Sequence, residues 1–149
     1  MATNKQELGN FGEEFVAKSI ACPSCKSLEK TLKLLPQNFK CADLICDFCG
    51  YLAQVKSVTV KDIDLLPQKI LGAAWKPQKE RMDSGIYFPL FIVAYKDKKN
   101  VSVYFLPSDL QTTKMFTPRK PLSESARRAG WQGFMIDLSL GLSAPTKLI

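Results

Sequence analysis

Three side chains of the types that hydrolyse phosphodiesters lie on either side of one turn: Asp43, Gln54 and Lys56. Residues 51–60 are rich in β-branched side chains and predict a strand. Alternate side chains of a strand point the same way, so Gln54 and Lys56 share a face, and a hairpin would bring Asp43 beside them. The two oxygen donors could bind a magnesium ion. The lysine could orient or deprotonate a water and offset charge in the transition state.

The same spacing also fits purely structural roles. An aspartate next to a turn commonly caps that turn, and a lysine on an alternating strand is commonly solvated. Spacing alone therefore leaves both interpretations of Asp43, Gln54 and Lys56 open.

Two Cys-x-x-Cys turns bracket Asp43, and their cysteines are Cys22, Cys25, Cys46 and Cys49. Two such turns can present four thiolates to one zinc ion in a tetrahedron; the alternatives are two disulfides or scattered buried cysteines. With all four positions taken by sulfur, the zinc would be structural and not catalytic. We interpret Cys41 as a small buried side chain in the middle of a strand.

The length and composition of the chain limit its fold, its partners and its chemistry. The chain has 149 residues, 46% of them hydrophobic and 23% charged, which fits one globular domain. Its net charge of +7 favours a polyanionic partner, nucleic acid first and an anionic membrane second. The absence of histidine excludes Ser-His and Cys-His catalysis. No signal peptide or membrane-spanning run is visible, so we expect a soluble, cytoplasmic protein with reduced thiols and no membrane partner.

The elements that must position these residues follow from hydrophobic periodicity. Residues 10–20 predict a helix, with Asn10 as N-cap and Glu13 as its capping-box partner. Residues 27–35 fit either a short helix or a loop. Further strands are expected at 39–45, 86–95, 101–106 and 134–138. Further helices are expected at 65–75, kinked or ended by Pro77, and from Ser123 to Gly130. This order predicts an α/β fold with a mixed sheet flanked by helices.

Residues 42–49, ADLICDFC, and 54–57, QVKS, resemble the PD-(D/E)xK nuclease core of DpnI-type restriction endonucleases, which include the Dam-replacing proteins. A more specific similarity lies in residues 119–122, RKPL, 126–131, ARRAGW, and 136–139, IDLS. The order of the pieces also agrees, beginning with EEFV at 13–16 and CPSC at 22–25. The resemblance spans nearly the whole chain, as far as that family's catalytic domain. Enzymes of this type cut DNA at GATC sites when the adenine is N6-methylated.

The resemblance implies a PD-(D/E)xK restriction-endonuclease-like fold with an inserted four-cysteine zinc knuckle. It places Asp43, Gln54 and Lys56 at the Asp, acidic and Lys positions of the nuclease motif, and the four knuckle cysteines on the family's zinc ligands. It also implies a methyladenine-recognition segment that contains Arg119, Ala129, Gly130 and Trp131.

The side chains of this recognition segment suit DNA contact. The Trp131 indole could pack against methyl groups in a groove or stack on an exposed base; the alternative is a half-buried core aromatic. Arg127 and Arg128 are adjacent on an expected short helix and cannot share one face. We therefore expect at most one of them to read DNA directly, and the other to bind phosphate or an acidic neighbour.

Two features depart from the family's pattern. Gln54 stands where the motif has an acid, as it does in the similar Mrr-type nucleases. A carboxamide oxygen can bind a hard cation but adds no charge, so Glu13 is our candidate for an additional metal contact through water. The chain also stops after the catalytic domain. We expect a single domain at 1–149 without the C-terminal winged helix that usually reads the methylated site, and hence weaker affinity.

These residues together predict a magnesium-dependent endonuclease with a structural zinc that cuts duplex DNA, with N6-methyladenine within GATC as its preferred site. Two alternatives remain open. One is a catalytically weak or inactive module that binds methylated DNA. The other is a zinc-ribbon adaptor between proteins, which predicts no salt-sensitive affinity for DNA.

Overall fold

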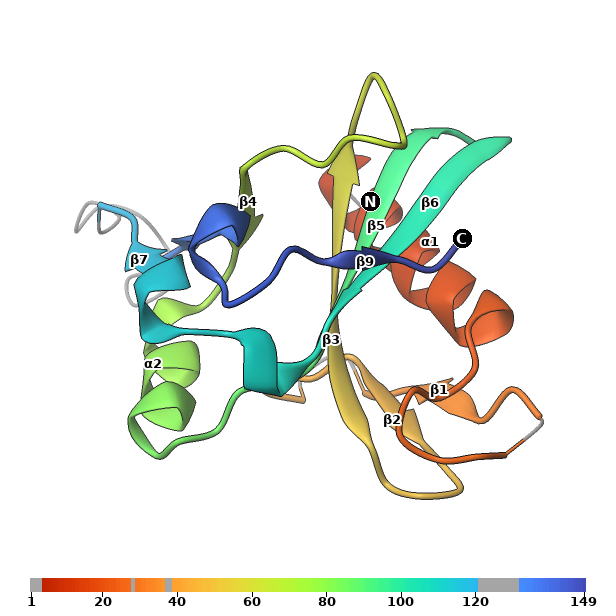
Figure 1. The fold of residues 1–149 in the computed structure, drawn as a ribbon, viewed down its shortest axis with the longest axis horizontal. Coiled ribbons are helices and arrows are strands. Elements are labelled where there is room, and N and C mark those ends of the chain that lie inside the picture. The colour runs from red at the N-terminus through yellow and green to blue at the C-terminus, as the bar shows by residue number, and fades with distance from the viewer. Residues whose placement is uncertain (1–3, 28, 37–38, 121–131) are drawn as a thin grey trace.

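The computed structural model describes residues 4–27, 29–36, 39–120 and 132–149. It shows a mixed α/β fold with two α-helices, two sheets and a cluster of four cysteines in that part of the chain, as the sequence predicts (Figure 1). The larger sheet has the strand order β1-β2-β3-β5-β6-β9. Its strands are β1 Leu32–Leu34, β2 Leu44–Cys46, β3 Leu52–Thr59, β5 Leu90–Asp97, β6 Asn100–Leu106 and β9 Thr146–Lys147. Its mixed character comes from β3, which pairs parallel with β5, whereas the other pairs are antiparallel.

Helix α1, Asn4–Ser19, covers one face of this sheet (Figure 1). Val16 of the helix packs in one buried cluster with Val55 of β3 and with Phe91 and Val93 of β5. Gly12 lets the helix approach closely, because a Cβ at this position would lie 1.9 Å from Ser57 Oγ. The first helix is therefore held directly over β3, the strand that carries Gln54 and Lys56.

The second layer lies against the opposite face of the larger sheet (Figure 1). It consists of helix α2, Trp75–Asp83, and a small antiparallel sheet of order β4-β8-β7. Its strands are β4 Lys69–Gly72, β7 Phe116–Pro118 and β8 Phe134–Asp137, and three short 3₁₀ helices span Ser108–Leu110, Thr113–Met115 and Leu138–Leu140. Ile92 and Leu106 from the larger sheet pack with Phe134 and Ile136 from the smaller one. The central strand β5 is thus buried on both faces, as its continuous apolar run predicts.

The predicted strands at 51–60, 101–106 and 134–138 are confirmed. The strand predicted at 86–95 begins only at Leu90, and the one predicted at 39–45 begins only at Leu44. The predicted helix at 65–75 is wrong, since its second half forms β4, which pairs with β8. The role given to Pro77 is also wrong, because Pro77 lies in the first turn of α2 and does not end a helix. Asn10 is no N-cap, because α1 begins at Asn4. Ser123 and Gly130 fall outside the described residues.

Neither α1 nor α2, the two α-helices in the described part of the chain, is long and apolar enough to cross a membrane.

Candidate active site

The four cysteines of the two Cys-x-x-Cys turns converge as predicted. Their Sγ atoms all lie within 4.8 Å of one another. The Cys22–Cys49 sulfurs are 3.7 Å apart and the Cys25–Cys46 sulfurs 3.8 Å apart. Tetrahedral zinc with Zn–S bonds of about 2.3 Å requires S···S separations of about 3.8 Å. The group therefore fits a zinc ion, and its spacings are far too long for disulfides.

Neighbouring groups orient these sulfurs. The Thr31 hydroxyl lies 3.0 Å from Cys46 Sγ, and the Cys49 backbone N–H donates to the same sulfur at 3.4 Å. The Ser24 N–H donates to Cys22 Sγ at 3.4 Å. Hydrogen bonds of this kind fix metal ligands in place. Gly50, with φ of 80°, allows the chain to leave the second turn in a left-handed conformation.

The second cysteine turn joins β2 to β3 as an antiparallel hairpin, with Leu44 opposite Ala53. Asp43, at the open end of this hairpin, has its N–H bonded to Ala53 O at 2.9 Å. Its side chain reaches further along β3, where Asp43 Oδ2 accepts the Val55 N–H at 2.7 Å. The hairpin thus places the Asp43 carboxylate against the strand that carries Lys56, as the sequence predicts.

The backbone at Cys41 bears on why the Val55 N–H bonds to a side chain and not to a backbone carbonyl. Its φ is 68°, in the left-handed region, and it is half-buried in a bend before β2. β2 begins only at Leu44, after this bend, and the Val55 N–H bonds to the Asp43 side chain. The interpretation of Cys41 as a buried mid-strand residue is wrong.

Glu13 reaches the same place from α1. Its carboxyl lies close enough to the Asp43 carboxylate to interact with it. Burial, followed by the charge and hydrogen bond of Asp43, raises the pKa of Glu13 to about 7, although nearby Lys56 lowers it. The predicted capping role of Glu13 is wrong, since it lies in the middle of α1. Two carboxyl groups close enough to share a proton can instead share a divalent cation.

Gln54 follows Ala53 on β3, one residue beyond the Leu44–Ala53 pair, and its side chain is buried toward α2. Its amide nitrogen donates to Gln78 Oε1 at 3.0 Å. Gln78 is not identified from the sequence, because the sequence places a helix end at Pro77. A proline followed by polar residues was a usable signal for the first turn of a helix.

Lys56 opens onto a groove of about 1050 Å³ between β3 and β4. Lys61, Lys69 and Arg119 also line this groove, and Asp62 is the one carboxylate among its lining residues in the described part of the chain. Its charge therefore favours an anion. Arg119, exposed after β7, shares the groove with Lys56. Five other residues of the recognition prediction lie outside the described residues: Arg127, Arg128, Ala129, Gly130 and Trp131.

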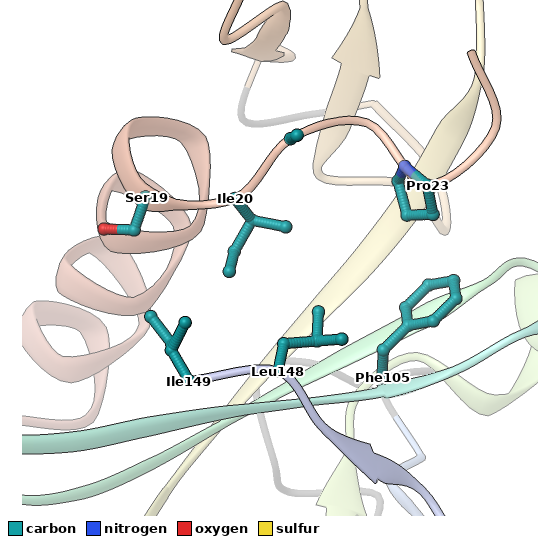
Figure 2. Close-up of a pocket in the computed structure, with 7 residues that line it drawn as sticks. Ser19, Ile20, Pro23, Phe105, Leu148 and Ile149 are labelled. Atoms are coloured by element: carbon teal, nitrogen blue, oxygen red, sulfur yellow. The ribbon is translucent and has the colours of Figure 1, made fainter. Parts of the chain in front are cut away.

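A second pocket, of about 290 Å³, lies between the end of α1 and β6. Figure 2 shows Ile20, Phe105 and Leu148 around it. Its lining residues carry no ionisable side chain within the part of the chain described. The chemistry expected from the sequence therefore belongs to the β3 edge and the groove beside it.

Comparison with known protein families finds a match that covers most of this chain. Residues 1–147, nearly the whole length, match the model described as DpnI, the Dam-replacing family.

Proposed function

Because the chain belongs to the DpnI Dam-replacing family, we propose that it hydrolyses duplex DNA at N6-methyladenine within GATC sites, with magnesium as cofactor. Membership of the family implies a methylation-dependent restriction endonuclease that binds methylated DNA. Beyond what the family implies, we propose that the enzyme depends on magnesium and that residues 1–149 form a single nuclease domain. We also propose the cleavage site and the role of each residue given below.

The observation that carries the proposal is the meeting of Glu13, Asp43 and Lys56 at the edge of β3. Asp43, Gln54 and Glu13 would hold the magnesium ion, because carboxylate and carboxamide oxygens suit this hard cation. Bound there, magnesium would polarise the scissile phosphate and lower the pKa of a water. Asp43 is fixed for this work by its bond to the Val55 N–H.

Lys56 acts beside these oxygen donors. Its ammonium orients the attacking water and offsets the negative charge that builds up on the phosphate in the transition state. It lies on the side of β3 that lines the groove, where a phosphate could approach it.

The groove would hold the DNA backbone next to Lys56. Lys61, Lys69 and Arg119 line it and would neutralise phosphates. We assign recognition of methyladenine to Arg119, Arg127, Arg128, Ala129, Gly130 and Trp131, following the family resemblance.

The zinc knuckle has a structural part in this proposal. It closes the β2–β3 hairpin, and the hairpin sets the position of Asp43. Zinc would therefore support catalysis without touching DNA.

The test is digestion of fully Dam-methylated and unmethylated plasmid with magnesium. We expect the methylated plasmid alone to be cut, and the Lys56→Ala variant to lose at least about 100-fold in rate. Lys33→Ala, which removes an exposed lysine on β1, is the matched control. Equal cutting of both plasmids would remove the methylation dependence, and no cutting of either would remove the nuclease.

A second candidate is a module that binds methylated DNA but cuts it weakly or not at all. The observation that favours it is Gln54, a neutral side chain whose amide is already bound to Gln78. Binding to a methylated duplex without nicking, in magnesium and in manganese, would decide for this candidate.

A further inference from the structure

Gln54 and Gln78 form a polar pair inside the protein, between β3 and α2. Their residues are only 5% and 3% exposed, and Gln54 Nε2 donates to Gln78 Oε1 at 3.0 Å. Burying amides is costly unless they are hydrogen-bonded, and two apolar side chains would fill these two positions at less cost. The pair therefore calls for a reason beyond packing.

We propose that Gln78 is a positioning residue that holds the Gln54 carboxamide with its oxygen available to the metal. This inference rests on the proposed function and adds a residue to it. A free carboxamide can rotate by half a turn, which exchanges its oxygen and its nitrogen. A nitrogen turned to the metal would repel it, since the NH₂ group is a donor only. By accepting the Gln54 NH₂, Gln78 keeps the oxygen out of this bond and free to be a ligand.

Gln78 can do this because α2 is anchored at both ends. The Trp75 N–H donates to Gln132 O at 2.7 Å, and the Trp75 ring packs on Phe134 with centroids 5.5 Å apart. Met82 in the last turn is buried in the core. A side chain on a helix held in this way has little freedom to follow Gln54, so it imposes one orientation.

The position of Gln54 makes its orientation matter. It follows Ala53, the residue whose carbonyl accepts the Asp43 N–H, and it has no charge of its own to attract a cation. A carboxylate in this place would bind a metal with either oxygen, whereas a carboxamide has one usable oxygen. The replacement of the motif's acid by glutamine thus creates the need for an acceptor such as Gln78.

The decisive comparison uses two variants of the full chain in its zinc-bound form. Gln78→Glu, measured at a pH where the new carboxylate is ionised, can only accept and keeps the Gln54 oxygen free, whereas Gln78→Met has a similar shape and no amide. Manganese binding is measured by titration calorimetry, and the magnesium concentration for half-maximal cleavage is measured in parallel. We expect Gln78→Met to weaken manganese binding, and to raise the magnesium concentration for half-maximal cleavage, by about tenfold or more each. In Gln78→Glu both values should stay within about threefold of the wild type.

A double variant separates positioning from folding. In the Gln54→Ala background, Gln78→Met should cause no further loss of manganese affinity, because the ligand it positions is absent. Wild-type binding in Gln78→Met, or equal losses in Gln78→Met and Gln78→Glu, would overturn the inference while leaving the nuclease intact. A wild type that neither binds manganese nor cuts DNA would overturn the proposed function itself.

A measurement on the wild type alone guards against a Gln78→Met chain that does not fold. The Gln54 side-chain NH₂ signals can be assigned by NMR through their loss in Gln54→Glu. We expect magnesium to shift these signals while their exchange with solvent stays slow, because the bond to Gln78 persists. Signals that do not respond to magnesium would rule out Gln54 as a positioned ligand.

Discussion

The Asp43 carboxylate accepts the backbone N–H of Val55 at 2.7 Å, where a longer β2 would have supplied a backbone carbonyl. One side chain therefore completes the sheet and faces Glu13 at the same time. Because these two roles use different properties of Asp43, hydrogen-bond acceptance and charge, substitutions can separate them.

We expect Asp43→Asn to abolish detectable DNA cleavage while leaving the free energy of unfolding within about 1 kcal/mol of the wild type, because the amide oxygen still accepts the Val55 N–H. Asp43→Ala should be inactive too, and less stable by about 1–3 kcal/mol, because it leaves that N–H without its partner. Urea unfolding and plasmid cleavage measure the two effects. Asp47→Asn, an exposed aspartate in the cysteine turn, is the control. An active Asp43→Asn would contradict the assignment of Asp43 as a metal ligand.

Glu13 predicts a pH dependence of stability without added magnesium. The fold raises the pKa of Glu13 from 4.5 to about 7, so between these values the folded chain binds a proton that the unfolded chain does not. Stability should therefore fall as the pH rises from about 4.5 to 7. Glu13→Gln removes the titrating group and should be more stable than the wild type above pH 7, by about 1–2 kcal/mol given the partial exposure of Glu13, and similar to it below pH 4.5.

Thermal unfolding at several pH values measures this difference, in which effects common to both chains, such as zinc loss in acid, cancel. Glu7→Gln, an exposed glutamate in the first turn of α1, is the control and should track the wild type. A constant difference between Glu13→Gln and the wild type from pH 4 to 8 would show that the fold does not raise the pKa of Glu13.

The sequence was informative where local pattern decides structure. The apolar run of β5 and the alternation in β3 predicted their strands, and the hairpin prediction brought Asp43 to β3. It failed where partners far along the chain decide. Residues 69–72 have apolar spacing that suits a helix, but they pair with β8, more than sixty residues later. The contact between Glu13 and Asp43 likewise depends on how α1 packs on β3, which no local pattern contains.

Zinc removal should disable the enzyme indirectly. Cys49→Ser removes one of the four sulfurs, so we expect loss of bound zinc, a fall in melting temperature of about 10 °C or more, and loss of cleavage that added magnesium does not restore. Cys41→Ser is the matched control, because Cys41 lies outside the cluster and should keep its zinc. Zinc content by elemental analysis and melting by circular dichroism give the readouts. A Cys49→Ser chain that cuts normally would show that the knuckle does not set the position of Asp43.

Gly12 offers a test of how closely α1 must lie on β3. A Cβ at residue 12 would lie 1.9 Å from Ser57 Oγ, so Gly12→Ala should destabilise the chain by about 1–3 kcal/mol and slow cleavage by moving Glu13 away from Asp43. Ser57→Ala should cost little alone, because Ser57 Oγ is buried without a hydrogen-bond partner among the described residues.

The double variant Gly12→Ala/Ser57→Ala should then regain the stability and the cleavage rate that Gly12→Ala alone loses. With the hydroxyl gone, the remaining contacts of the new methyl are 3.3 Å to Ser57 Cβ and 3.4 Å to Val93 Cγ2, which small shifts can relieve. Alanine also favours the helix over glycine by about 1 kcal/mol, which works in the same direction. Gly9→Ala, with nothing within 4 Å of its new methyl, controls for that helix effect and should be slightly stabilising. If the double variant regains stability but not cleavage, then the approach of α1 to β3 is not what places Glu13 for catalysis.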